Sequence, residues 1–275
     1  MNSQASATLL QRIDVALTLA LRNDHDLAPL TASAQRFDTR DLFIKGVSER
    51  DLPITLGRAR LHTPHSGMAL AINSFFPWRQ ASQQLKLASH TGFDAIQFDV
   101  RCPTGLRGTP PHLDALALSD DHAVGITVRT VEYLTRRRAS IASSYDALLE
   151  ETPGMKAWHD HVADWRADRI SYRHIDLAAL VKYVTALAHT FPDRSSTLFY
   201  LYWEPMNADA FDAFHHHRHE LQALVEAVSG ARVDFAATSF DRLWQDWIDL
   251  ASPGWVTDHV ARLRRRYAVT LDSTN

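Results

Sequence analysis

The sequence predicts an α/β fold in which a three-strand meander is followed by a helix and a fourth strand, with helical extensions at both ends. Three observations carry this prediction. Residues 93–131 contain three strand-like segments, residues 177–191 carry an apolar stripe at helical spacing, and residues 197–203 form a continuous apolar run. The order is therefore strand, strand, strand, helix, strand, and the helices are expected to pack on the sheet.

The composition is that of a globular chain with no strong overall charge. Its 275 residues are 45% hydrophobic and 22% charged, which is enough to build a core and excludes wholesale disorder. The 29 Lys and Arg residues nearly balance the 32 Asp and Glu residues, for a net charge of −3. Contact with nucleic acid is therefore expected only at a local basic patch.

The sequence lacks the features typical of export or membrane insertion. Arg12 and Asp14 interrupt the apolar residues near the N-terminus before a signal-peptide core develops. No run approaches the roughly 18 apolar residues of a membrane span. The single Cys102 cannot form an intrachain disulfide. These features predict a cytoplasmic protein without a membrane partner.

Residues 1–67 are predicted to form an N-terminal extension of helix and loop. An apolar stripe at helical spacing predicts an amphipathic helix that packs on the rest of the protein. The stripe comprises Leu9, Leu10, Ile13, Leu17 and Leu21. Prolines at positions 29, 53 and 64 interrupt any regular pattern after it. Residues 68–275 are expected to form the α/β domain with its C-terminal helices.

Three strands are predicted in the middle of the chain. Apolar and polar residues alternate in residues 93–100 (FDAIQFDV), and less cleanly in residues 113–118 (LDALAL), where Asp114 stands among apolar residues. Residues 101–111 contain three prolines and two glycines, so they predict a shaped loop longer than a tight turn. Residues 124–131 (VGITVRTV) have the β-branched content typical of a strand.

The clearest helix follows Asp176, which is predicted to cap it, and ends before Pro192. The run at residues 197–203 (TLFYLYW) fits a strand buried on both faces. Helices are predicted for the rest of the chain: residues 211–228, a helix capped by Ser239, and residues 255–267.

The candidate catalytic and metal-binding residues lie mainly on the second and third predicted strands. Asp114 follows the proline-rich loop, and twelve residues separate it from Thr127. Arg129 lies two residues further on and therefore shares a strand face with Thr127. Asp114 is either a solvent-facing strand residue or part of a site, and a site is favoured because Asp is disfavoured inside strands. Asp99 either faces Asp114 across the strand pair or is an exposed strand carboxylate.

This spacing resembles the PD-(D/E)XK nuclease superfamily, in which an Asp on one strand and a Glu-X-Lys on the next converge on divalent ions. Three further runs resemble an uncharacterised bacterial family of restriction-endonuclease-like proteins: residues 102–114 (CPTGLRGTPPHLD), 130–134 (TVEYL) and 201–208 (LYWEPMNA). The resemblance extends over about residues 66–267. It implies a restriction-endonuclease-like core formed by the meander, the helix and the fourth strand.

The resemblance implies an endonuclease that hydrolyses phosphodiesters with Mg²⁺ held by Asp114 and Asp99, because carboxylate oxygens suit this ion. The chain departs from the pattern at two positions. Thr127 stands where the acidic ligand belongs, which removes a negative charge. Arg129 stands where the Lys belongs and cannot act as a base. The sequence therefore predicts a DNA-associated relative with a degenerate metal site and weak or absent hydrolysis.

Glu132 is a candidate replacement for the missing carboxylate. It lies five residues beyond Thr127, which places it on the opposite face of an unbroken strand. Only a bulge or the end of the strand would bring it to the site. A separate role for Glu132 is favoured, and the alternative stays open.

Two basic residues are candidate phosphate contacts. Arg107 lies between Gly105 and Gly108, where its guanidinium either binds an oxyanion or forms a salt bridge within the loop. Lys182 lies on the polar side of the clearest helix. In some nuclease-fold proteins a basic residue there replaces the strand Lys, but ordinary solvation is favoured for Lys182.

A histidine cluster and two arginine runs complete the candidates. His215 and His219 have the i, i+4 spacing of a helical metal site, but two histidines leave a zinc site incomplete, and a solvated helix face is favoured. The arginines of residues 136–138 and 262–266 are candidate contacts to a DNA backbone. The first run is favoured because the second has the spacing of an ordinary solvated helix face.

An alternative function is a protein-interaction or scaffold module that retains the fold without binding nucleic acid. The chain has seven tryptophans, and aromatic residues are enriched at interfaces. Four of them belong to the last third of the chain: Trp203, Trp244, Trp247 and Trp255. The sequence leaves the oligomeric state and any DNA specificity open.

Overall fold

The computed structural model describes residues 3–24, 38–47, 61–135, 140–250 and 253–272. Within these ranges, five strands form one mixed sheet in the order β1-β2-β3-β4-β5. The antiparallel meander consists of β1 (Ala95–Arg101), β2 (His112–Leu118) and β3 (His122–Arg129). Parallel to β3 run β4 (Ser195–Tyr202) and then β5 (Val233–Ser239). The mixed α/β class predicted from the sequence is confirmed.

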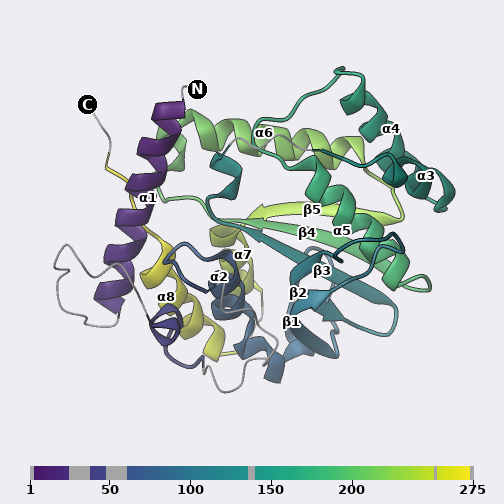
Figure 1. Ribbon diagram of the computed structural model, residues 1–275. Helices are drawn as coiled ribbons and strands as arrows, with labels where there is room; N and C mark the ends of the chain where they lie inside the picture. The colour runs from purple at the N-terminus through teal and green to yellow at the C-terminus, as the bar shows by residue number, and fades with distance from the viewer. Residues whose placement is uncertain (1–2, 25–37, 48–60, 136–139, 251–252, 273–275) are drawn as a thin grey trace.

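Helices cover both faces of the sheet, as Figure 1 shows. One layer holds α3 (Ser144–Glu151), α4 (Lys156–Arg166), α5 (Leu177–Thr190) and α6 (Asp212–Ala227). The other holds α2 (Gly67–Phe75), α7 (Phe240–Asp249) and α8 (Trp255–Tyr267). The N-terminal helix α1 (Ser3–Asp24) packs on α8, so the first and last helices lie side by side (Figure 1).

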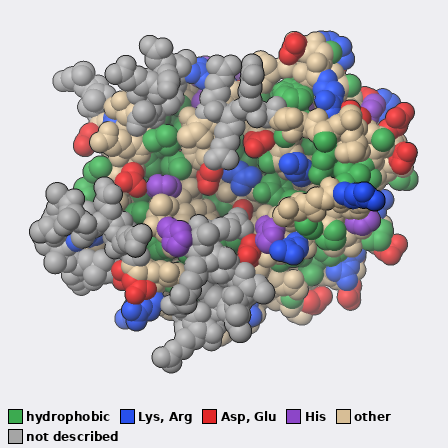
Figure 2. All heavy atoms as spheres, in the orientation of Figure 1, with side chains coloured by type: hydrophobic (Ala, Val, Ile, Leu, Met, Phe, Trp, Pro, Cys, Tyr) green, Lys and Arg blue, Asp and Glu red, His purple; other side chains and the backbone are tan. Residues whose placement is uncertain are grey.

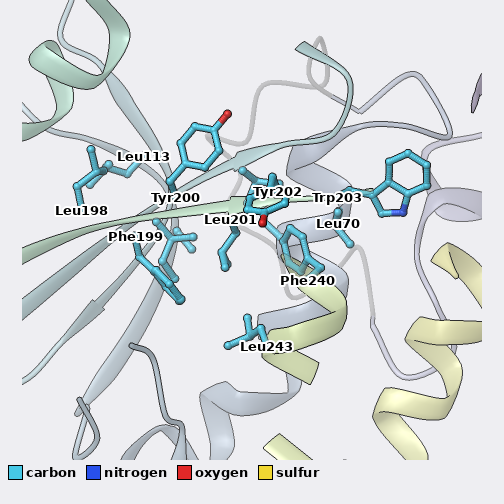
Figure 3. Packing of buried hydrophobic residues seen from close by; sticks show 14 of the residues in the cluster. Leu70, Leu113, Leu198, Phe199, Tyr200, Leu201, Tyr202, Trp203, Phe240 and Leu243 are labelled. Carbon is cyan, nitrogen blue, oxygen red and sulfur yellow. The ribbon is translucent and has the colours of Figure 1, made fainter. Parts of the chain in front are cut away.

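The internal strand β4, between β3 and β5, is buried along almost its whole length. Figure 3 shows its side chains alternating between the helical layers: Tyr200 points away from α7, whereas Phe199 points toward Leu243 of that helix. Burial on both faces is the property that the apolar run at residues 197–203 predicted.

The predicted helix caps are present. Asp176 accepts a hydrogen bond from the Ala179 amide at 2.9 Å, and Ser239 accepts one from the Arg242 amide at 3.3 Å. Strand β5 was not predicted from the sequence. Its core residues Val233 and Phe235 give way to Ala236 and Ala237, whose small side chains weaken the strand signal.

The arginine run near the C-terminus is not a uniformly solvated face. Arg266 is almost fully buried, and its Nη1 donates to the Leu17 carbonyl of α1. Arg264 pairs with Asp241 of α7 at 3.0 Å. Two of the four arginines in this run are therefore bound to other groups of the protein. No helix in the described ranges is both long and apolar enough to cross a membrane.

Gly125 sets how closely α5 approaches the sheet. A Cβ built at this position of β3 would lie 3.0 Å from side-chain carbons of Leu113 and Leu187. Leu187 belongs to α5 and Leu113 to β2, so three elements meet at the glycine. This contact fixes the layer that carries the candidate site.

Gly125→Ala is expected to destabilise the protein by about 2 kcal/mol, because the added methyl group overpacks this contact. Denaturant unfolding followed by circular dichroism measures the change. Gly254→Ala is the matched control, since among the described residues no atom beyond its own neighbours in the chain lies within 4 Å of a Cβ there. Equal stability of the two variants would contradict the proposed close packing.

Candidate functional site

The β1–β2 hairpin is distorted where two acidic residues face each other. The pairs Phe98↔Ala115 and Val100↔Leu113 place Asp99 opposite Asp114. Asp99 has a φ of 51°, in the left-handed region that non-glycine residues seldom adopt. The two carboxylates predicted to form the site thus lie at the same level of the hairpin, at a strained position.

The Asp99 carboxylate is engaged by its neighbours on the hairpin. Its side chain is only 5% exposed, and its Oδ1 lies 2.9 Å from His112 Nδ1. His112 Nε2 in turn accepts a hydrogen bond from Arg101 Nε at 3.4 Å. Asp99 therefore belongs to a polar cluster with His112 and Arg101.

Asp114 fastens the end of β3. Its buried Oδ2 accepts the Val128 amide proton at 2.7 Å and lies 3.9 Å from Arg129 Nη1. The backbone pairs between β2 and β3 end at Ala115↔Ile126, so the Asp114 side chain binds an amide just beyond the ladder. This carboxylate holds a strand end and compensates a nearby cation.

Thr127 is completely buried in β3, and its hydroxyl has no hydrogen-bond partner among the described residues. It shares a strand face with Arg129, as the period of two predicts. The position that would supply an acidic ligand therefore carries a neutral group enclosed by the core.

Arg129 lies at the base of a cavity. Its side chain is 16% exposed, and its Nη1 donates to the Val128 carbonyl at 2.8 Å. The guanidinium carbon lies 5.8 Å from the centre of the Tyr183 ring and 6.0 Å from that of Tyr200. Burial favours a lower pKa, but the surrounding tyrosine and carboxyl groups raise the pKa of Arg129 overall. It is a permanent cation.

The cavity, of about 310 Å³, opens at the carboxyl end of β3 beside the N-terminus of α5. Such crevices at the carboxyl ends of parallel strands are common ligand sites. Its charged and aromatic lining comes from β3, β4, α5 and the segments before α3 and α5. The residues that matter for its chemistry are Arg129, Glu132, Arg173, Asp176, Tyr183 and Tyr200.

Glu132 lies on the rim of this cavity because β3 ends at Arg129. Glu132 therefore does not lie on the opposite face of an unbroken strand. Its Oε2 accepts hydrogen bonds from the amides of Thr130 at 2.7 Å and Val131 at 3.1 Å. The carboxylate thus shapes the turn that follows the strand.

Arg107 and Lys182 are both exposed and do not line the cavity. The loop that carries Arg107 rests on the C-terminal end of α5, where Thr190 Oγ1 donates to the Pro103 carbonyl. The cavity lies beside the first half of α5, where it is lined by Asp176, Ala179 and Tyr183. Arg107 therefore contributes nothing to the lining of the Arg129 cavity.

A single side chain organises the segment before α5. The Glu220 carboxylate of α6 accepts hydrogen bonds from three consecutive amides, those of Arg173, His174 and Ile175, at 2.8 to 3.1 Å. These three residues line the cavity. Sequence reasoning missed Glu220, because no local pattern reveals a contact between residues so far apart.

His217 is buried beneath the cavity, whereas His215, His216 and His219 are exposed. Its Nε2 lies 3.1 Å from Tyr200 Oη, and its ring stacks on Tyr133 at 3.8 Å. Burial holds the pKa of His217 well below the usual value. The sequence did contain a signal, since His217 shares helical spacing with the buried Phe214 and Leu221.

The donor set does not fit the magnesium site that the resemblance implies. Among the described residues, no group of three or more His, Cys, Asp or Glu side chains is placed to hold a metal ion. Asp114 already binds an amide proton beside a guanidinium, and Thr127 is neutral. The arginine run at residues 136–138 lies outside the described residues.

Thr127→Val is expected to raise the free energy of unfolding by about 1 kcal/mol, because it removes a buried hydroxyl that lacks a partner. Thr197→Val is the matched control. Its Oγ1 lies 3.0 Å from His122 Nε2, so loss of this bond should cost about 1 kcal/mol. Denaturant unfolding of both variants measures these changes. A loss of stability in Thr127→Val would contradict the prediction, because it would show that the hydroxyl has a partner.

Stability is expected to fall as the pH drops from about 6.5 toward 4. Burial holds the pKa of His122 and of His259 at about 4 in the folded protein, against 6.5 in the unfolded chain. Below pH 6.5 the unfolded chain therefore binds protons that the folded protein does not. In urea titrations at several pH values, His259→Leu should flatten this dependence. His219→Ala, at an exposed position, should leave the pH dependence unchanged. A wild-type free energy of unfolding that does not change with pH would contradict this prediction.

Comparison with known proteins identifies one family. No curated protein and no solved structure matches the chain. A family model described as "Restriction Endonuclease associating with ARP" matches residues 26–268, which is most of the sequence. The protein therefore belongs to the restriction-endonuclease-like family that this model describes.

Proposed function

We propose that the protein is a nuclease-like, DNA-associated member of its family whose metal site is degenerate. The observation that carries this proposal is the pairing of Asp114 with Arg129 and the Val128 amide, next to a neutral, buried Thr127. A site with this charge has little attraction for Mg²⁺, because the ion needs several oxygen ligands with negative charge. Mg²⁺-dependent hydrolysis is accordingly weak or absent.

We also assign the meander, α5 and β4 to a restriction-endonuclease-like core. This assignment follows the family match and the element order, and it places Arg129 at the position of the superfamily Lys. A buried guanidinium that stays charged is suited to holding a phosphate, since its planar donors fit oxyanions. Arg129 would thus bind the DNA backbone without activating water.

The charge of the surface favours local contact with DNA. On the described part of the face in Figure 2, Lys and Arg side chains are interspersed with Asp and Glu side chains. DNA would therefore be held at the Arg129 cavity and not wrapped over a basic surface. The family description also names association with ARP, and we extend that association to this chain as part of the proposal.

The scaffold alternative loses its main support. Trp203, Trp244 and Trp247 are at most 2% exposed and pack in the core, so they do not form an interaction surface. Trp255 is partly buried and packs against the core, with its ring centre 4.9 Å from that of Trp78. The tryptophan content of the C-terminal third therefore reflects core packing.

Plasmid incubation with Mg²⁺ or Mn²⁺ tests the degenerate site. The wild type should give no more cleavage than Asp114→Asn, which keeps an oxygen to accept the Val128 amide proton. Strong metal-dependent cleavage that Asp114→Asn abolishes would show that the site is functional, against this proposal.

A salt-dependent gel shift tests DNA association. Wild-type binding should weaken steeply with salt, and Arg129→Gln should lower the affinity about tenfold and reduce the salt slope by about one. The control is Arg242→Gln, which removes a charge on α7 that is paired with Asp246. Absence of binding by the wild type at low salt would contradict DNA association.

A further inference from the structure

The Arg129 cavity is sized for a small group. Its volume of about 310 Å³ is at the low end of the roughly 300–1,000 Å³ typical of small-molecule sites. Arg129 is recessed at its base, with 16% of its side chain exposed. A ligand that contacts the guanidinium must therefore enter the cavity, as a single nucleotide can and a paired double strand cannot.

An aromatic ring stands beside the cation. Tyr183 is partly exposed on the cavity wall, and the Arg129 guanidinium lies over one face of its ring, 5.8 Å from the ring centre, which leaves the other face for a base. Ala179, one helical turn earlier on the same face, also lines the cavity and is too small to cover the ring. Proteins that hold unpaired bases combine these two features, a cation for the phosphate and an aromatic face for the base.

The remaining charges oppose a polyanion inside the cavity. Glu132 and Asp176 both line it, and each also accepts backbone amide protons. With Arg129 and Arg173 they give the lining two positive and two negative side chains. One phosphate at Arg129 is compatible with this balance, whereas a continuous row of phosphates is repelled by the carboxylates.

We propose that this cavity receives one unpaired nucleotide of a DNA strand, with its phosphate on Arg129 and its base on Tyr183. This inference rests on the proposed DNA association and makes it more specific. The preferred DNA has a single-stranded segment or an overhang, and a fully paired blunt duplex binds less tightly.

Fluorescence anisotropy with internally labelled DNA tests the proposal on the full chain. Single-stranded and overhang DNA should bind about tenfold more tightly than a blunt duplex of the same sequence. Tyr183→Ala and Tyr183→Leu should lower the affinity for single-stranded and overhang DNA about tenfold, because they delete the stacking face. They should leave the affinity for the blunt duplex unchanged. Tyr183→Phe should retain it.

The controls distinguish binding of one unpaired nucleotide from DNA association in general. Tyr145→Ala, on α3 and away from the cavity, should bind like the wild type, and urea unfolding verifies that each variant is folded. Equal binding of blunt and single-stranded DNA, or an equal loss for both in Tyr183→Leu, would overturn the inference while DNA association stands. Failure of the wild type to bind any of these DNAs at low salt would overturn both.

Discussion

The contact on which the site depends is that of the Asp114 carboxylate with the end of β3. This buried group accepts the Val128 amide proton and lies 3.9 Å from the Arg129 guanidinium. A buried charge is tolerated only when it is paired and hydrogen-bonded, so each group needs the other. The pair fixes where β3 ends and where Arg129 lies in the wall of the cavity.

Much of the fold was predictable because the signals are local. Alternation marked β1, the content of β-branched residues marked β3, and a capped apolar stripe marked α5. Strand β5 was not predicted because small side chains interrupt its apolar pattern beyond Phe235. A position of Glu132 near Arg129 is only the less favoured prediction, because the sequence does not show that β3 ends at Arg129.

The site was harder to predict because contacts distant in sequence decide it. Asp114 and Arg129 were recognised as candidate site residues, but their mutual compensation depends on where the β2–β3 ladder ends. Glu220 reaches the segment before α5 from another helix. The replacement of an acidic ligand by Thr127 was visible in the sequence. Its complete burial became visible only in the structure.

The central claim is that Asp114 serves as a structural partner of Arg129 and the Val128 amide, not as a magnesium ligand. Thermal unfolding with increasing Mg²⁺ tests it most directly, because an ion that binds only the folded state raises the Tm. We expect Mg²⁺ to leave the Tm of both the wild type and Asp114→Asn essentially unchanged. A rise in the wild-type Tm with Mg²⁺ that Asp114→Asn abolishes would contradict it.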